Sequence, residues 1–180
     1  MKINEKDEIK KLDELLTTEE INKSNNISKI TDKIYLGDEE GAKELDFFKA
    51  EGIHTIISLS ANTQEYPDDI GINLIKIEIE DSVTINILYY VKQCIELIEK
   101  ADKVYIHCSL GINRSPTIVI GYLMWKTHSN YDDVFEFVKK RRDCIEPNNL
   151  FIMKLHKFQT MLKKSNYNLA KIDVDKHIKK

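Results

Sequence analysis

The sequence predicts an α/β domain with a central, mostly parallel sheet. Short apolar segments of strand length alternate along the chain with longer segments of helical periodicity, an order that favours parallel strands joined by helices. The 180 residues suffice for one domain with a buried core. The composition, 42% apolar and 32% charged, is typical of a soluble globular protein and unlike that of a disordered chain.

Four segments have the length and composition of strands. Residues 33–37 form a short apolar segment that ends at Gly37, and residues 74–79 alternate between apolar and polar side chains. Residues 55–59 and 104–107 are nearly continuous apolar segments, which is typical of strands buried on both faces of a sheet.

Five segments have the periodicity of helices. Residues 38–50 are predicted to form a helix with Asp38 near its N-terminus, and Gly52 should end it. Residues 116–125 are apolar and almost uncharged, so this helix is expected to be buried on most sides. The other three helices are amphipathic and are expected over residues 85–100, 131–142 and 148–162, with a loop over 61–71.

Composition changes at both ends of the chain. Residues 27–164 form the predicted domain, and a polar tail, 165–180, follows it. In the 26 residues before the domain, apolar side chains at helical spacing predict a short amphipathic helix over 5–20. Lys10 and Lys11, placed before leucines, suggest a kinase-docking segment, and a coiled-coil or regulatory helix is the alternative.

Charge and cysteine content limit the possible functions. A net charge of −3 gives no support for nucleic-acid binding, which needs a basic face. No apolar segment approaches the roughly 20 residues that cross a bilayer, and the charged residues 1–16 are unlike a secretory signal. Three cysteines, an odd and sparse set, indicate free thiols in a reducing compartment. We therefore expect a monomer of the cytoplasm, with the nucleus as an alternative.

We expect structural roles for two of the cysteines and no metal site among the histidines. Cys94 falls on the apolar side of a predicted helix and Cys144 precedes an isoleucine, so both are expected to be core thiols, with a redox role as the alternative. No two histidines have the spacing of metal ligands together with a third donor. We therefore expect no metal and no other cofactor.

Residues 107–116 lie where an apolar strand meets an apolar helix. A loop at such a junction can turn successive backbone N–H groups inward, and the helix adds its own free N–H groups and the positive end of its dipole. Gly111 permits the bend, Arg114 offers a planar fork for two phosphate oxygens, and Pro116 suits a first helical turn. The segment predicts a phosphate site lined by Ser109, Leu110, Gly111, Ile112, Asn113 and Arg114.

Cys108 is expected at the base of the same site. The helix dipole, the inward N–H groups and Arg114 all favour its thiolate, which is a strong nucleophile. The expected reaction is in-line transfer of a phosphoryl group to sulfur, followed by hydrolysis of the phosphocysteine. Ser115 is placed to donate a hydrogen bond to the departing sulfur.

The leaving oxygen needs a proton from a carboxylic acid. Asp81 follows the predicted strand 74–79, whose carboxyl end should lie at the same sheet edge as Cys108. Glu80 is the competing candidate. Adjacent residues of an extended segment point in opposite directions, so only one of the two can face the site if the strand persists.

These segments resemble the catalytic domain of dual-specificity protein phosphatases. The resemblance spans residues 27–162 and is carried by the His-Cys-x5-Arg-Ser segment 107–115 together with 34–37, 79–82, 122–124, 135–142 and Pro147–Asn148. It implies a three-layer α/β/α fold of the cysteine-dependent phosphatase type.

The same resemblance implies roles for individual residues. Cys108 would be the nucleophile, Arg114 the phosphate clamp, Asp81 the general acid and Ser115 the helper of the second step. Asn148 resembles an asparagine that steadies the phosphate loop. His107 is expected to be structural, with its imidazole bonded to that loop so that it helps to fix the thiolate.

Departures from the family and absent features narrow the subclass. Leu110 and Asn113 stand where members commonly have alanine and serine, although both still supply backbone N–H groups. Trp125 is the only tryptophan, so the Trp-Pro-Asp loop of tyrosine-specific phosphatases is absent, and a phosphate loop without lysine is unlike that of inositol-lipid phosphatases. With 26 residues before the domain, the chain resembles a small, atypical member.

We therefore expect a protein phosphatase that hydrolyses phosphotyrosine and phosphoserine or phosphothreonine. Its partners would be phosphoprotein substrates, with a kinase as one candidate. A phosphatase for a non-protein monoester (an RNA 5′ end, a glucan or a lipid) is the first alternative, and a catalytically silent phospho-binding module is the second. The basic segment 139–142 is interpreted as a solvated helix face, although it could also attract acidic phosphopeptides.

Overall fold

The computed structural model describes residues 26–80, 82 and 85–174. The helix expected over residues 5–20 lies outside the described residues. Five strands form one sheet in the order β1-β2-β5-β3-β4, in which β1 is antiparallel to β2 and every other pair is parallel. The strands are β1 (Ile27–Lys29), β2 (Ile34–Gly37), β3 (Thr55–Ser58), β4 (Asn73–Lys76) and β5 (Val104–His107).

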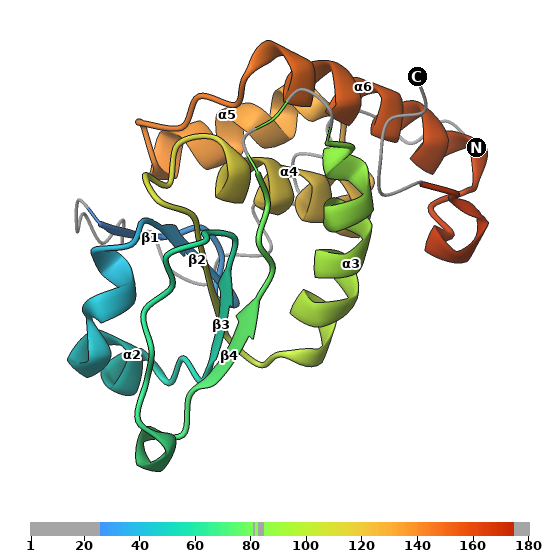
Figure 1. Ribbon diagram of the computed structural model, residues 1–180. Coiled ribbons are helices and arrows are strands. Elements are labelled where there is room, and N and C mark those ends of the chain that lie inside the picture. Colours follow the sequence, from blue (N-terminus) through green and yellow to red (C-terminus); the bar gives the residue numbers. More distant parts are fainter. Residues whose placement is uncertain (1–25, 81, 83–84, 175–180) are drawn as a thin grey trace.

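The sheet is the middle layer of three, which confirms the predicted α/β/α fold. Four helices cover one face and a single short helix covers the other, at the lower left of Figure 1. The larger group contains α3 (Ile87–Lys100), α4 (Arg114–Thr127), α5 (Tyr131–Arg141) and α6 (Asn149–Lys164), and the single helix is α2 (Leu45–Glu51). Helix α4 packs on β2 and β5 and is itself enclosed by α3, α5 and α6, as its apolar sequence predicts.

The helix expected over residues 38–50 is interrupted. A 3₁₀ turn, Gly41–Lys43, comes first, and α2 begins only at Leu45 because Glu44 leaves the helical conformation. Asp38 directly follows strand β2, but its carboxylate accepts from the N–H of Gly41 at 2.9 Å and caps the short turn instead of α2. Gly52, at a φ of 69°, ends α2 as predicted.

Strand β1 was not predicted. Its three residues are too few to show alternation, and it is held by its antiparallel partner β2. Strand β4 is shorter than the predicted segment 74–79, yet the N–H groups of Ile77 and Ile79 still donate to the carbonyls of Ser58 and Leu59, at 2.8 and 3.4 Å. The chain therefore runs beside β3 up to Ile79, the residue before the two candidate acids.

Hydrophobic side chains pack on both faces of the sheet. The larger cluster lies beneath α3, α4, α5 and α6, and the smaller one, which includes Phe48 and Tyr105, lies beneath α2. Part of the segment expected to be a polar tail joins the larger cluster: Ile172 is buried, and Tyr167 accepts at its carbonyl from the indole of Trp125 at 3.0 Å. Two further 3₁₀ turns span Asp68–Ile70 and Leu169–Lys171.

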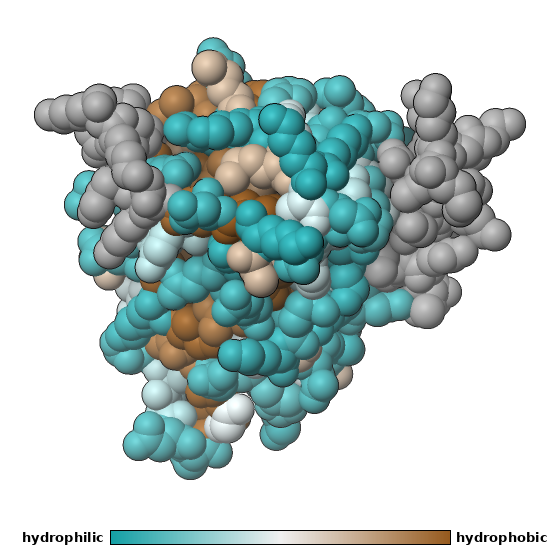
Figure 2. Space-filling view, turned by 90° about the vertical axis from the view of Figure 1, so that its right-hand side faces the viewer, coloured by the Kyte–Doolittle hydropathy of each residue, from teal (hydrophilic) through white to brown (hydrophobic). Residues whose placement is uncertain are grey.

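The face of the molecule drawn in Figure 2 is mostly hydrophilic. Figure 2 shows one face on which apolar side chains form separate patches between polar and charged ones. None of the helices in the described parts of the chain has both the length and the apolar character needed to span a bilayer.

Candidate active site

Cys108 lies directly after β5, at the carboxyl edge shared by the parallel strands β2, β3 and β5. Helix α4 begins six residues later at Arg114, so residues 108–113 form the loop between strand and helix. We call residues 108–114 the phosphate loop. Cys108 is 2% exposed, so its sulfur lies below the surface at the start of the loop.

The hydroxyl of Ser115 donates to Cys108 Sγ at 3.2 Å. Ser115 is fully buried in the first turn of α4, which fixes its distance from the sulfur. A hydroxyl donor stabilises a sulfur anion, so the structure brings together the two residues that the sequence assigned to the breakdown of a phosphocysteine.

Arg114 is held by the ends of two strands. Its Nη1 donates to the carbonyls of Ile79 and Leu59, at 3.0 and 3.3 Å. Its Nη2 donates to Ser109 Oγ at 3.1 Å. With Nη1 occupied in this way, the Nε–Nη2 side of the guanidinium is the edge suited to a bidentate phosphate contact.

A chain of hydroxyls connects Arg114 to a carboxylate. Ser109 Oγ, which accepts from Arg114, lies 2.9 Å from Ser60 Oγ, and Ser60 in turn donates to the carboxylate of Glu39. Neither Glu39 nor Ser60 was predicted to belong to the site. Ser60 is 49 residues from Ser109 in the sequence and Glu39 is farther away, so only the β2–β3–β5 arrangement brings them together.

The carbonyls at the two ends of the phosphate loop are held from outside by backbone groups. Glu39 N donates to the carbonyl of Ser109 at 3.3 Å, and Glu146 N donates to that of Ile112 at 2.8 Å. In a trans peptide the N–H points opposite to the preceding carbonyl. The N–H groups of Leu110 and Asn113 therefore face the interior of the loop, as an anion site requires.

Asn148 acts on the phosphate loop through its backbone. Its N–H donates to Asn113 Oδ1 at 2.9 Å, whereas its own side-chain oxygen caps α6 by accepting from the N–H of Phe151 at 2.9 Å. The side chain that links the phosphate loop to the start of α6 is thus that of Asn113, one of the two departures from the family pattern.

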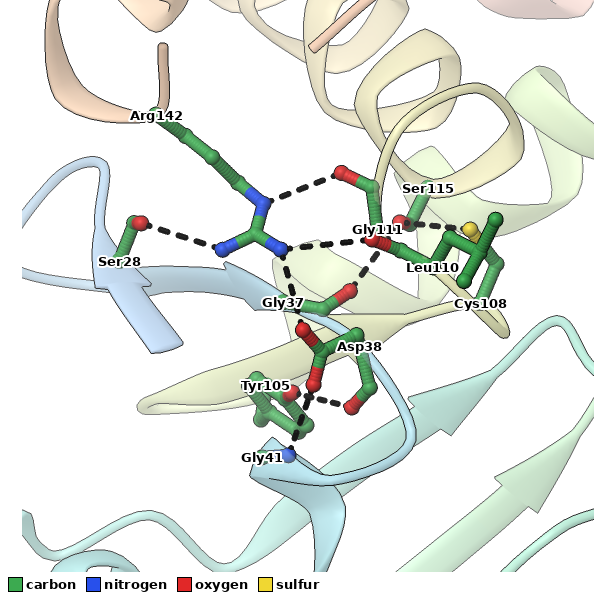
Figure 3. Close-up of polar contacts among 10 residues, drawn as sticks. All are labelled: Ser28, Gly37, Asp38, Gly41, Tyr105, Cys108, Leu110, Gly111, Ser115 and Arg142. Atoms are coloured by element: carbon green, nitrogen blue, oxygen red, sulfur yellow. Dashed lines mark hydrogen bonds and ion pairs between the residues drawn. The ribbon is translucent and has the colours of Figure 1, made fainter. Parts of the chain in front are cut away.

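Arg142 corrects the interpretation of segment 139–142 as a solvated face. Its side chain is 4% exposed and makes an ion pair with Asp38 at 3.4 Å. It also donates to the carbonyls of Gly111 and Leu110 in the phosphate loop, at 3.0 and 3.5 Å (Figure 3). The sequence could not reveal this, because a helix-end arginine beside three other cations looks solvent-exposed until the loop packs on it.

The structure describes one of the two acid candidates, Glu80. Asp81 lies outside the described residues. Glu80 is exposed and follows Ile79, whose carbonyl holds Arg114. The assignment of the general acid therefore stays a prediction.

Of the other two cysteines, one was misassigned. Cys94 is buried, and burial raises the pKa of its thiol to about 12, which fits an inert core residue. Cys144 is exposed, because it lies in the loop between α5 and α6 and only Ile145 beside it enters the core. Within the described parts of the chain, His, Cys, Asp and Glu form no cluster suited to a metal ion.

His107 is completely buried and its ring stacks on Tyr105, with centroids 5.5 Å apart. By distance and angle neither ring nitrogen makes a hydrogen bond among the described residues, although the backbone of Cys108 interacts with the imidazole and on its own raises its pKa. The bond expected between His107 and the phosphate loop therefore stays a prediction. Burial lowers the pKa of His107 from 6.5 to about 4. The imidazole is therefore neutral at physiological pH.

The buried neutral His107 should make stability depend on pH. Between about pH 4 and 6.5 the unfolded imidazole binds a proton that the folded one does not, so stability falls as pH falls through this window, by about 3 kcal/mol in total. In His107→Phe, which keeps a stacking ring, urea unfolding should show a shallower pH dependence. The exposed His54, changed to Asn, is the control and should leave the slope as in the wild type. Parallel slopes for His107→Phe and wild type would contradict this account.

Comparisons with known proteins define the class of this protein. The model of the family "Dual specificity phosphatase, catalytic domain" matches residues 34–161. The chain therefore belongs to the dual-specificity phosphatase family and is a protein phosphatase, as the loop and its surroundings predict.

Among relatives, the protein named "Putative tyrosine phosphatase 123R" of Invertebrate iridescent virus 6 is 34% identical over 77% of this chain and 96% of its own length. Dual specificity protein phosphatase 1-B of Xenopus laevis is 34% identical over 72% of this chain but only 36% of its own length. The chain thus spans about a third of that longer relative. Among solved structures, that of DUSP15 has a TM-score of 0.73 at 29% identity and covers 80% of this chain and 94% of its own.

Proposed function

We propose that Cys108 carries out a two-step hydrolysis of phosphate monoesters on proteins. The thiolate forms a bond to phosphorus while the P–O bond to the leaving group breaks, and the leaving oxygen takes a proton from a carboxylic acid. A water oxygen then attacks phosphorus, the P–S bond breaks, and the carboxylate accepts the water's proton. The observation that carries this proposal is the 3.2 Å contact from Ser115 to Cys108 Sγ at the base of the phosphate loop.

Asp81 is our proposed acid. Asp81→Asn should lower turnover of phosphotyrosine by about 10²-fold and leave binding of the phosphate largely intact. Phosphotyrosine is chosen because its leaving group is better than those of phosphoserine and phosphothreonine. The alkaline side of the pH profile, where ionisation of the acid slows the wild type, should flatten in this variant. Glu80→Gln is the matched control, and if it causes the larger loss, the acid is Glu80.

Ser115 should matter for the second step only. Removing its hydroxyl in Ser115→Ala leaves Cys108 Sγ without this donor, so the sulfur becomes a poorer leaving group and the phosphocysteine should accumulate. Rapid mixing with a chromogenic aryl phosphate should show a burst of about one product per enzyme, followed by a slow steady state. A slow first turnover with no burst would place Ser115 in the first step instead.

For substrates, we propose phosphotyrosine together with phosphoserine and phosphothreonine. The experiment is a panel of phosphopeptides that differ only in the phosphorylated residue, assayed without added metal. Turnover of all three supports the proposal, and turnover of phosphotyrosine alone would restrict it. Hydrolysis of RNA 5′ ends, glucans or lipids in preference to every peptide would favour the non-protein alternative, and no turnover with retained phosphopeptide binding would favour the silent module.

The chemistry of the thiol also bears on the biological setting. We propose a monomer that meets phosphoproteins of the cytoplasm or nucleus, a kinase being one candidate substrate, because the thiol mechanism needs a reducing compartment. A Cys108→Ser protein, incubated with cell extract, should retain phosphoproteins that free phosphotyrosine or phosphate then displaces. Retention that neither anion reverses would argue against binding through the phosphate loop.

A further inference from the structure

The two central carbonyls of the phosphate loop depend on one side chain. The carbonyls of Ser109 and Ile112 bind the backbone N–H groups of Glu39 and Glu146, which every side-chain substitution except proline leaves in place. Those of Leu110 and Gly111 instead accept from the guanidinium of Arg142, through Nη2 at 3.5 Å and Nε at 3.0 Å. Figure 3 shows the guanidinium beside these two peptides, on the opposite side from Cys108.

The position of these carbonyls determines where the next N–H groups point. Because a trans peptide places its N–H opposite its carbonyl, fixing the carbonyls of Leu110 and Gly111 on Arg142 aims the N–H groups of Gly111 and Ile112 into the loop. Gly111 has a φ of 65°, and a Cβ there would lie 2.6 Å from Arg142 Nη2 and 2.5 Å from the carbonyl of Gly37. The guanidinium thus packs directly against the bend.

Arg142 is in turn held by Asp38. One carboxylate oxygen of Asp38 pairs with Arg142 Nη2 at 3.4 Å, and the other accepts from Gly41 N at 2.9 Å. The Asp38 carbonyl accepts from the hydroxyl of Tyr105 at 2.7 Å, which ties this residue to β5. Ser28 of β1 accepts from Arg142 Nη1 at 3.4 Å. Both partners are thereby anchored to the sheet.

We propose that Asp38 and Arg142 form a positioning pair that presets the phosphate loop for its anion. The pair touches neither the substrate nor Cys108. It fixes two of the inward N–H groups, and these stabilise both a bound phosphate dianion and the Cys108 thiolate. The inference rests on the proposed phosphate-binding role of the loop.

Arg142→Lys tests the pair, since a lysine keeps the charge but cannot hold both carbonyls with one planar fork. Tungstate, a dianion of similar shape to phosphate, should bind about tenfold more weakly by calorimetry. At a fixed neutral pH, alkylation of Cys108 by iodoacetamide, followed by mass spectrometry of the modified peptide, should be about three- to tenfold slower. Asp38→Asn, which keeps an acceptor for Gly41 N, should show the same changes at smaller size.

The neighbouring Arg141 provides the matched control. Its guanidinium lies 3.5 Å from the ring centroid of Phe137 and donates to that residue's carbonyl within α5. Arg141→Lys should therefore leave tungstate affinity and the rate of Cys108 alkylation unchanged. A merely structural role of Arg142 would lower the melting temperature without moving either quantity in the folded protein.

Two outcomes separate this inference from the proposed function. If the variants remain folded and both quantities stay at their wild-type values, the positioning pair is disproved, whatever the activity. If Arg142→Lys does not fold, the milder Asp38→Asn decides by the same two measurements. If tungstate affinity and the alkylation rate change but the protein hydrolyses no phosphoprotein, the pair is supported and the proposed function is refuted.

Discussion

Cys108→Ser should lose at least about 10⁴-fold in hydrolysis of a chromogenic aryl phosphate, measured without metal. A serine hydroxyl in this position is un-ionised, and the imidazole of the preceding His107 cannot act as its base because it is buried and stacked on Tyr105. The backbone N–H groups of the phosphate loop and the Arg114 guanidinium remain in this variant. Tungstate should therefore still bind to the variant within a few-fold of the wild-type affinity.

The control for this experiment is Cys144→Ser, because Cys144 is an exposed thiol outside the phosphate loop. It should retain full activity. Equal rates for wild type and Cys108→Ser would end the assignment of the nucleophile, and equal losses in both cysteine variants would point to general damage.

Arg114→Lys should lower kcat/KM by about 10²- to 10³-fold, the size of effect found when a preorganised donor is lost from an oxyanion site. The guanidinium uses Nη1 to bind the carbonyls of Ile79 and Leu59 and leaves a planar edge for the phosphate. An ammonium cannot make these contacts and a bidentate phosphate contact at once.

Both kcat and KM should change in this variant, because the fork binds the ground state and the transferring phosphoryl group alike. Arg141→Lys is again the matched control and should match the wild type. A loss below fivefold in Arg114→Lys would mean that a point charge suffices and that the fork geometry is not used.

The predictable part of the fold consists of elements long enough to show a period. The apolar segment at 104–107 and the helices around α3 and α4 have such patterns, and each lies within a few residues of its predicted place. Strand β1 and the helix break at Glu44 show no such pattern in the sequence. Tertiary contacts, and not the local sequence, determine the conformation of the three residues of β1 and of the single residue at the helix break.

The candidate site divides in the same way. The phosphate loop was predictable because its chemistry is confined to a few consecutive residues, so spacing alone relates Cys108 to Arg114. Its supporting residues were not, because Asp38, Glu39 and Arg142 look like ordinary surface charges in the sequence. Their roles depend on which peptides of the loop come within hydrogen-bond distance after the chain folds.

The side chain of Leu110 has a practical consequence for inhibitor selectivity. It belongs to the phosphate loop, yet it is 69% exposed, the most exposed of the large hydrophobic side chains in the described residues. An inhibitor that joins a phosphate mimic to a short hydrophobic arm could cover this side chain while its charged end occupies the loop. Burying most of a leucine contributes about 1 to 2 kcal/mol, enough to discriminate about tenfold against phosphatases that carry alanine at this position.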